Sequence, residues 1–381
     1  MRGRTAALIA PTAVSTGAVA TSATAAGPPP PPKATNGHTV QLVASGLHTP
    51  TSFAFGAGQV FEGDGGVESK TAPPNGGVFV LKNGAATEIP GSPGFVAGLA
   101  WHQGSLYVSG GSITAKGPKW QLQRWSGWNG TTFTKRTVIY TAPKKFQGFN
   151  GIAFGPDGRL YVGVDTGLLD NNDHGPSTLS PYLYDILSIN TNGKGLKVFA
   201  TGIRQPWQMA FPKGSSSPFV SDLGQDSGAK NPPDFILRVH KGDNYGFPAC
   251  NWTSAGKCKG YAKPFEQFGP HTDLMGMVIM GKRLYTTSFT GIGAKGAGEV
   301  LSLPLSGGKL KPLLKGFVAP TVGLGANGGW LYVGELTGQV FRVKPKVRSR
   351  HPGPPLRRAG MSAHTLRRHR SEPRPPARRE A

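Results

Sequence analysis

One hairpin pattern recurs through residues 50–343 and limits the fold more than any other feature of the chain. Each copy has a short apolar strand, a turn that contains Gly, and a second strand with an aromatic residue near its centre. A further strand-like run follows each hairpin. The clearest copy is GIAFGPDGRLYVGVD at 151–165, and the aromatic residues that mark the copies are Phe61, Tyr107, Tyr161, Phe219, Tyr285 and Tyr332.

The repeat predicts an all-β protein with the architecture of a six-bladed β-propeller. Copies recur about every 50 residues, and units of that length with about four strands each are typical of propeller blades. The composition agrees, because 57 Gly and 34 Pro among 381 residues disfavour long helices. We expect the strand-like segment HTVQLVASG at 38–46 to complete the last blade and close the ring.

Both ends of the chain differ from the repeated region. Residues 1–26 combine a basic start, a small-residue apolar run and an Ala-rich cleavage site, which predicts a secretory signal peptide. A Pro-rich linker at 27–37 leads to the propeller, expected at 38–345. Residues 346–381 form a basic Arg/Pro-rich tail with few apolar residues to bury, so we expect disorder there. The protein should be secreted, periplasmic or held at the cell surface.

The net charge of +23 lies largely on these ends. Residues 1–37 carry +3 and residues 346–381 carry +9, so the folded region holds less than half of the excess. We therefore predict no specific nucleic-acid partner. No later stretch reaches the ~20 apolar residues of a membrane-spanning helix, so no transmembrane segment is predicted. The tail either contacts acidic cell-surface polymers or is a solvated segment without a partner, and the oligomeric state stays open.

The two cysteines lie close together, in PACNWTSAGKCKG. In an exported chain, Cys250 and Cys258 are expected to form a disulfide that closes a short loop. A zinc site would need further ligands, and no His or second cysteine pair stands nearby at metal-binding spacing.

Polar residues flank the hairpin strands at the end where the first strand begins and the second strand stops. Antiparallel pairing brings these positions to one end of a blade, and we expect a shared mouth where they meet. A converging set of this kind predicts a polar binding site, with or without a metal ion. The set comprises His48, Gln147, Arg204, Gln205, His271 and Asp273 before first strands, and Asp64, Asp165, Asp222 and Glu335 after second strands.

The segments around this mouth resemble the glucose/sorbosone dehydrogenase family, whose members are soluble six-bladed propellers that bind pyrroloquinoline quinone. The resemblance covers roughly residues 45–343. It rests on the order and spacing of several motifs, each of low specificity alone. They are NGIAFGPDGRLYVGVD (150–165), FATGIRQPWQMAF (199–211), SDLGQDSGAKNPPDFILRVHKGDNYGFPAC (221–250) and GPHTDLMGM (269–277).

The resemblance assigns catalytic roles to two positions. In the family, a His before the third blade takes a proton from the sugar hydroxyl while hydride passes to the quinone. An Asp at the neighbouring strand end orients that His. Here Asp165 matches the Asp, and the His position is matched by Gln147 or Gly148. Neither of these residues can accept the proton at neutral pH. His48 or His271 would be a substitute base if it faced the same mouth, and each is otherwise a turn histidine.

The resemblance also implies cofactor and metal positions. Arg204 matches the family's cofactor-binding Arg, and Gln205 replaces the usual Asn beside it. The turn that offers backbone carbonyls to calcium is matched by Gly224-Gln225. Asp222 just before it is either a metal ligand or a strand-end cap. The acidic run that follows in the family is reduced here to Asp234-Phe235-Ile236-Leu237.

The function implied is that of an exported enzyme that oxidises a small sugar with pyrroloquinoline quinone and calcium. Two alternatives remain open. A non-catalytic propeller that binds glycans or another protein is favoured by the unmatched His and by the lack of the family's Arg residues in KGFVAPTVGL. A calcium-dependent lactonase of the regucalcin type would use Glu335 or Asp222 as ligands. The Trp residues are expected to pack between blades rather than to stack on sugars.

Overall fold

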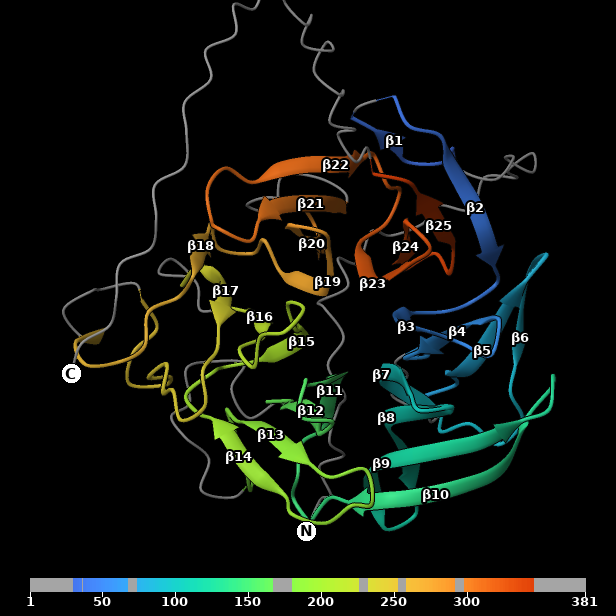
Figure 1. Cartoon of the computed structure of the whole chain (residues 1–381), viewed down its shortest axis with the longest axis horizontal. Helices are drawn as coiled ribbons and strands as arrows, with labels where there is room; N and C mark the ends of the chain where they lie inside the picture. Colours follow the sequence, from blue (N-terminus) through green and yellow to red (C-terminus); the bar gives the residue numbers. More distant parts are fainter. Residues whose placement is uncertain are drawn as a thin grey trace, which may run out of the picture. The chain divides into compact units, whose positions relative to one another are not determined.

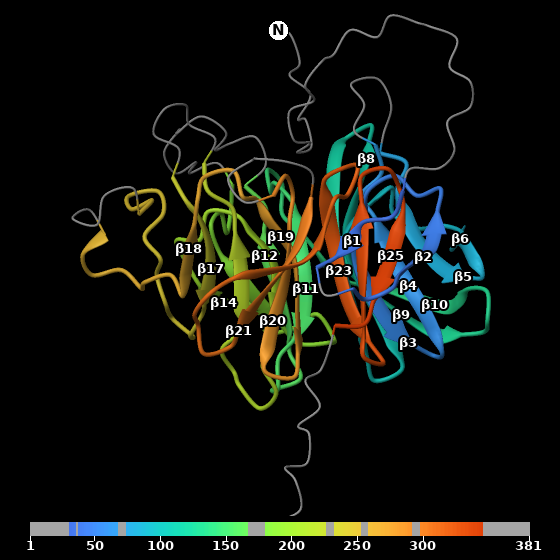
Figure 2. The ribbon, with the colours of Figure 1, turned by 90° about the horizontal axis from the view of Figure 1, so that it is seen from above.

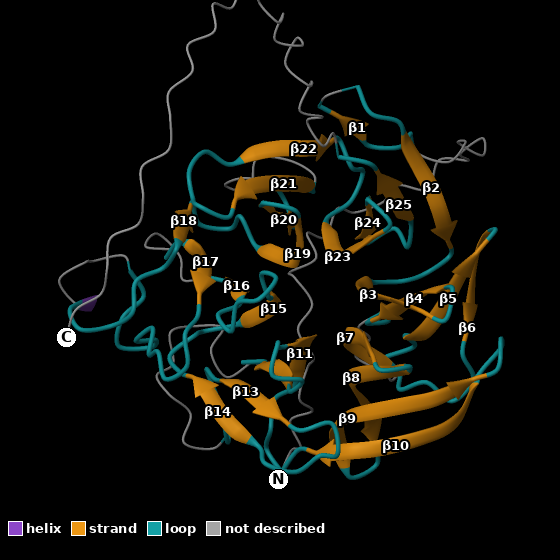
Figure 3. Cartoon of the chain, in the orientation of Figure 1, coloured by secondary structure: helices purple, strands orange, loops and turns teal. Residues whose placement is uncertain are grey.

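Every element named in the structure is a β-strand, which confirms the all-β class (Figure 3). The computed structural model describes residues 30–35, 37–67, 74–166, 180–225, 232–252, 258–291 and 298–345. The strands belong to one compact unit that ends at Pro345. Within the described ranges, no helix is long and apolar enough to cross a membrane. The expected signal peptide at 1–26 and tail at 346–381 lie outside the described residues.

Three sheets are simple four-stranded meanders in which each strand pairs antiparallel with the next. The first contains β7 (Phe95–His102), β8 (Ser105–Thr114), β9 (Gly117–Trp128) and β10 (Phe133–Thr141). The second contains β11 (Phe149–Phe154), β12 (Leu160–Val164), β13 (Ile186–Ile189) and β14 (Lys197–Ala200). The third contains β15 (Pro206–Ala210), β16 (Phe219–Asp222), β17 (Asp234–Arg238) and β18 (Glu266–Phe268).

Two larger sheets build on the same meander. A five-stranded sheet contains β19 (Leu274–Met280), β20 (Arg283–Ser288), β21 (Glu299–Pro304), β22 (Lys311–Lys315) and β1 (Lys33–Ala34). An eight-stranded sheet contains β23 (Thr321–Asn327), β24 (Trp330–Glu335), β25 (Val340–Val343), β2 (Val40–Ser45), β6 (Gly84–Glu88), β5 (Gly77–Lys82), β4 (Gln59–Asp64) and β3 (Pro50–Gly56), in that order.

The first strand of each meander lies innermost, and these strands form a closed circle (Figure 1). Going around the circle, β3 contacts β7, β7 contacts β11, β11 contacts β15, β15 contacts β19, β19 contacts β23, and β23 contacts β3. The view from above shows the strands of successive sheets standing side by side (Figure 2). This radial arrangement is propeller-like, and it brings the same end of every inner strand to one face.

Aromatic pairs fasten neighbouring sheets together. In three of the six meanders, the aromatic residue at the centre of the second strand meets a ring from the inner strand of the next meander. Tyr107 packs edge-on against Phe154 with ring centroids 4.8 Å apart, and Phe61 stacks on Trp101 at 5.6 Å. The pair Tyr332–Phe55, at 5.1 Å, joins the last meander to the first. Aromatic pairs of this geometry add stability beyond their buried area.

Glycines in the second strands allow the sheets to approach closely. A Cβ atom on Gly163 of β12 would lie 2.1 Å from the carbonyl oxygen of Pro206 in the next sheet. A Cβ atom on Gly334 of β24 would lie 2.4 Å from the Cβ of Pro50. These distances leave no room for a larger side chain, which explains the Gly in the repeated LYVG sequence.

The expected closing strand is confirmed. β2 pairs antiparallel with β25, with Val40 opposite Val343. Two features were not expected. β2 also pairs in parallel with β6, so that the first and last meanders share one sheet. Lys33–Ala34, placed in the linker by the sequence, instead forms β1 and pairs with β22.

Candidate functional site

Carboxylates at the ends of second strands hold the turns that lead into the inner strands. Asp222, the last residue of β16, accepts a hydrogen bond from the Gln205 backbone N–H at 2.8 Å. Asp64, the last residue of β4, accepts from His48 N at 2.7 Å and Thr49 N at 3.1 Å. Glu335 at the end of β24 accepts the Thr337 hydroxyl at 2.7 Å, and burial raises its pKa while that hydroxyl and the nearby Val318 and Ala319 backbone N–H groups oppose the rise. Asp64 and Asp222 therefore cap turns, which was the alternative considered for Asp222.

Asp165 is out of register with these three acids, although its side chain lies beside Gly148 in the turn before β11. Asp64, Asp222 and Glu335 each pair with the first residue of the inner strand. In the sheet of Asp165 that position is held by Val164, the last residue of β12, and Asp165 lies one residue further along. Side chains alternate sides in an extended chain, so a shift of one residue reverses the direction of the side chain. The grouping of Asp165 with Asp64, Asp222 and Glu335 as equivalent strand ends is therefore corrected.

Gln147 and Asp165 flank one turn. The Asp165 backbone N–H donates to the Gly148 carbonyl at 2.9 Å, which places the two predicted catalytic positions beside each other in the fold. The Gln147 side chain, partly buried, donates its Nε2 to the Lys145 carbonyl at 2.9 Å. An amide in this position is a hydrogen-bond donor and has no basic site near neutral pH.

Hydrogen bonds connect this turn to the residues expected to bind the cofactor. The Thr166 hydroxyl donates to Gln205 Oε1 at 3.1 Å, across the boundary between two sheets. Gln205 in turn donates its backbone N–H to Asp222, as described above. The network thus runs from the exit of β12 through the turn before β15 to the exit of β16. It brings together the predicted residues Asp165, Gln205 and Asp222 at one end of adjacent sheets.

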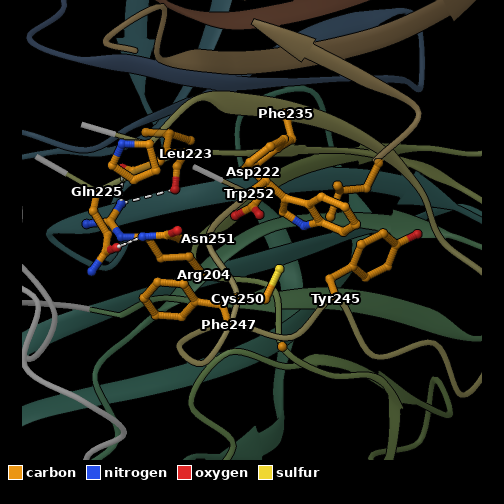
Figure 4. Close-up of a pocket in the computed structure, with 14 residues that line it drawn as sticks. Arg204, Asp222, Leu223, Gln225, Phe235, Tyr245, Phe247, Cys250, Asn251 and Trp252 are labelled. Carbon is orange, nitrogen blue, oxygen red and sulfur yellow. Dashed lines mark hydrogen bonds between the residues drawn. The ribbon is translucent and has the colours of Figure 1, made fainter. Parts of the chain in front are cut away.

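Arg204 lies at the centre of this network and is only 5% exposed. Its Nη1 donates to the carbonyl oxygens of Leu223 at 3.1 Å and Gly224 at 2.6 Å (Figure 4). The guanidinium charge lowers the pKa of both Asp222 and Asp234, against the stronger effect of burial. Arg204 therefore bonds the turn expected to bind calcium.

Asp234 links the network to a third sheet. Its Oδ1 accepts the Gly224 N–H at 2.6 Å, and its Oδ2 accepts the backbone N–H groups of Thr272 at 2.7 Å and Asp273 at 2.9 Å. The sequence marked Asp234 only as the remnant of an acidic run. An acid opening the otherwise apolar run Asp234–Leu237 was the available signal, since a buried carboxylate needs donors.

Two carboxyl groups near this end hold protons more tightly than usual. Burial raises the pKa of Asp222 to about 7, and the charge of Asp234 adds to the rise, while backbone donors and Arg204 oppose it. Burial also raises the pKa of Asp185 to about 7. The Asp185 carbonyl accepts the Val164 N–H at 3.1 Å, so Asp185 stands at the same end as Asp165. Asp185 was not among the predicted site residues, because no motif marks it.

A small cavity of about 20 Å³ lies beside Arg204 and Asp222 (Figure 4). Its walls include the aromatic rings of Phe235, Tyr245 and Trp252. The Asn251 amide, also in the wall, donates to Gln225 Oε1 at 3.4 Å. A space of this size holds about one water molecule, so a larger ligand would lie over the cavity rather than inside it.

The expected disulfide between Cys250 and Cys258 is present, with Cα atoms 5.1 Å apart, and Cys250 lines the same cavity. The substitute bases are placed as turn residues: His48 Nε2 lies 3.2 Å from the Asn75 amide, and the His271 carbonyl accepts the Thr290 hydroxyl at 3.2 Å. His48 precedes β3, where it occupies the position that Arg204 holds before β15.

The described residues at the Gly224 turn are not arranged for calcium. The Gly224 carbonyl, which would contact calcium, accepts a hydrogen bond from Arg204. In the described part of the chain, no group of three or more His, Cys, Asp or Glu side chains is arranged to hold a metal ion.

Solved structures with a similar fold include sugar enzymes, whereas no family model and no curated protein matches the chain. One is a candidate oxidoreductase (glucose dehydrogenase) from Thermus thermophilus, 20% identical, with a TM-score of 0.64 over 81% of this chain and 100% of that one. A candidate gluconolactonase is 14% identical, with a TM-score of 0.53 over 81% and 92% of the two chains. A gluconolactonase from Xanthomonas campestris is 13% identical, with a TM-score of 0.51 over 83% and 95%. These β-propellers share the fold.

Proposed function

We propose that this chain is a six-bladed propeller that binds a small sugar at the network around Arg204 and does not oxidise it with a quinone. The observation that carries the proposal is the hydrogen-bonded path from Thr166, the neighbour of Asp165 in the chain, through Gln205 to Asp222, because it unites the motifs that resemble the sugar dehydrogenases. The closed circle of inner strands supports six blades. The printed descriptions of the structural neighbours support a sugar as the ligand class.

The position matched to the catalytic base argues for binding without oxidation. Removal of a hydroxyl proton by a placed base contributes roughly 10²–10⁴ in rate. Gln147 cannot supply this step, and its amide is already bonded to the Lys145 carbonyl. The Arg204 contacts with Leu223 and Gly224 further argue against a calcium ion at that turn.

The polar groups beside the cavity suit sugar hydroxyls. Asn251 and Gln225 carry amides that both donate and accept, as a hydroxyl requires. Trp252 lies next to them and is partly buried against the apolar cluster that includes Phe199 and Tyr245. Beyond the packing role expected for the Trp residues, we assign its remaining surface to the C–H side of a sugar. This combination of one aromatic face and a few polar groups is common in small-molecule sites.

Calorimetric titration with a panel of aldoses and sugar acids tests the proposal. We expect saturable binding to the full purified chain, and no reduction of an electron-accepting dye after addition of pyrroloquinoline quinone and calcium. Trp252→Ala should weaken binding at least tenfold. Trp330→Ala is the matched control, because Trp330 is covered by Arg342 at 4.5 Å and Lys344 at 4.7 Å. Dye reduction with any aldose, or absence of binding across the panel, would contradict the proposal.

The proposal includes export. The disulfide between Cys250 and Cys258 supports it, since such bonds persist in oxidising compartments outside the cytosol. The leader predicted at 1–26 would direct export, and the basic tail at 346–381 would adhere to acidic cell-surface polymers. Fractionation of the native host, followed by detection of the chain in the cytosolic fraction only, would contradict this part.

Lactone hydrolysis is a second candidate function, favoured by Asp185. Its pKa of about 7 suits a group that takes a proton from water near neutral pH. Water would attack the lactone carbonyl while Asp185 accepts its proton, and Asp185 would return that proton to the ring oxygen as the ring C–O bond breaks, which gives the hydroxy acid. Acid release from a sugar δ-lactone at constant pH measures this reaction. Asp185→Asn should abolish it, whereas Asp157→Asn, in the turn at the other end of the same sheet, should not. Equal rates in both variants would exclude the role of Asp185.

A further inference from the structure

We propose that the guanidinium of Arg204 is the resident cation of this site, in place of a bound metal ion, and that removing it exposes a calcium-binding site. The inference rests on the contacts of Arg204 and does not depend on the sugar specificity proposed above. It concerns two consecutive carbonyl groups that accept hydrogen bonds from one guanidinium, and two buried carboxyl groups whose pKa values that guanidinium lowers.

The contacts of Arg204 are those that a metal ion would make at this turn. Nη1 donates to the carbonyl oxygens of Leu223 and Gly224, which belong to consecutive residues. Carbonyl oxygens turned toward one point are characteristic ligands of calcium, which prefers several hard oxygen donors. Because the guanidinium bonds to both, it keeps this turn folded around a positive charge that is part of the chain.

The surrounding carboxylates need that charge. Asp222 is 5% exposed and Asp234 is 1% exposed, and each raises the cost of ionising the other. Their oxygen atoms accept backbone N–H groups of Gln205, Gly224 and Thr272, which satisfies hydrogen bonding but supplies no net charge. The Arg204 charge lowers the pKa of both carboxyl groups, so it offsets part of the cost of ionising them where they are buried.

The first meander gives an internal comparison. Asp64 caps the turn before β3 as Asp222 caps the turn before β15. Asp64 pairs with Gly77 across its sheet, and Asp222 pairs with Phe235 across the other. The residue before each of these partners is therefore equivalent in the two sheets: Gly76 in the first and Asp234 in the second. In that sheet the residue at the position of Arg204 is His48. Arg204 is thus present in the sheet that has the second carboxylate, Asp234, and absent from the sheet that lacks it. This is expected if Arg204 balances the charge of Asp234.

Calcium titration of the wild-type chain and of Arg204→Ala tests the proposal. We expect no calcium binding at this turn in the wild type. The variant should bind calcium with a Kd of about 10⁻⁴–10⁻³ M, because the carbonyls of Leu223 and Gly224 and the carboxylate of Asp222 become available. Its thermal midpoint should fall in a chelator and recover when calcium is added. Terbium luminescence gives a spectroscopic readout, since Tyr245 and Trp252 in the cavity wall would sensitise the bound ion.

Two further variants separate charge from packing. Arg204→Lys keeps the positive charge and should remain insensitive to calcium. Arg283→Ala removes an arginine that bonds Ser302 at 2.8 Å in another sheet, and should also remain insensitive. Arg204→Gln also removes the charge but loses less side-chain volume. It is the variant to titrate with calcium if Arg204→Ala does not fold in a chelator.

Three results would overturn the proposal. The first is calcium stabilisation of the wild type equal to that of the variants. The second is a folded Arg204→Ala or Arg204→Gln protein that neither binds calcium nor sensitises terbium. The third is failure of both variants to fold in calcium as well as in chelator, because the proposal requires calcium to restore the lost charge.

Discussion

Replacing Glu62 with valine should stabilise the protein, because Glu62 is a buried acid without a partner. The residue is 0% exposed on β4, between its cross-strand neighbours Phe53 and Phe79. Within the described part of the chain, neither carboxylate oxygen has a hydrogen-bond partner. The equivalent position in other meanders is occupied by a valine, as at Val162 and Val333.

The expected gain follows from desolvation and from the proton that Glu62 holds. Burial raises its pKa well above the usual value of 4.5, the Asp64 charge adds to the rise, and the nearby Thr51 N–H opposes it without completing a hydrogen bond of normal geometry. Burying an unpaired polar group costs about 1–3 kcal/mol. Above the unfolded-state pKa, the folded chain also retains a proton that the unfolded chain releases. Stability therefore falls by about 1.4 kcal/mol per pH unit until the folded-state pKa is reached.

Thermal unfolding of the wild type and two variants between about pH 4 and about pH 8 measures the cost of the unpaired polar group and the pH-dependent cost of the retained proton. Glu62→Val should raise the unfolding free energy by about 1–3 kcal/mol at acid pH, and by about 1.4 kcal/mol more for each pH unit up to the folded-state pKa of Glu62. Glu62→Gln should remove the part of the pH dependence that comes from Glu62 while keeping an unpaired polar group. The control Glu88→Gln changes an exposed acid in the same sheet and should have no effect. Destabilisation by Glu62→Val, or a gain that does not change with pH, would refute the reasoning.

Other substitutions test the sheet contacts, the disulfide and the cap. Phe154→Ala should cost about 2–3 kcal/mol in chemical denaturation, because it removes the contact with Tyr107 from a half-buried position; an unchanged midpoint would contradict the role of the aromatic pairs. Replacing Cys250 and Cys258 with alanine should cost about 2–3 kcal/mol, and reductant should then have no further effect. Asp222, with its folded-state pKa raised to about 7 from 3.8, makes wild-type stability fall as pH rises from about 4 to 7. Asp222→Asn should flatten that slope, and an unchanged slope would count against the buried proton.

The periodic parts of the fold were predictable from the sequence, whereas single-residue register was not. Apolar alternation and the central aromatic residues identified the hairpins, because every sheet has to bury the same faces against its neighbours. The segment at 38–46 was correctly assigned as a closing strand. Pairing of Lys33–Ala34 with β22 could not be foreseen, because two residues carry no periodicity.

The sequence predicted which residues lie near one another at the candidate site, but not their individual contacts. The motifs correctly grouped Arg204, Gln205 and Asp222, because chain order fixes which strand ends are adjacent. Asp165 was placed one residue out of register, since both Val164 and Asp165 are compatible with a strand end. The part played by Asp234 depends on donors from Thr272 and Asp273, which lie in a different sheet and are not near it in sequence.

The pairing of β2 with β25 also sets the order of events during synthesis. Val40 leaves the ribosome long before its partner Val343 is made. Until β25 exists, β2 has only its short parallel pairing with β6, and such distant pairing is slow to form. With the proposed export through a secretion channel, β2 would lack its antiparallel partner until β25 has crossed the channel.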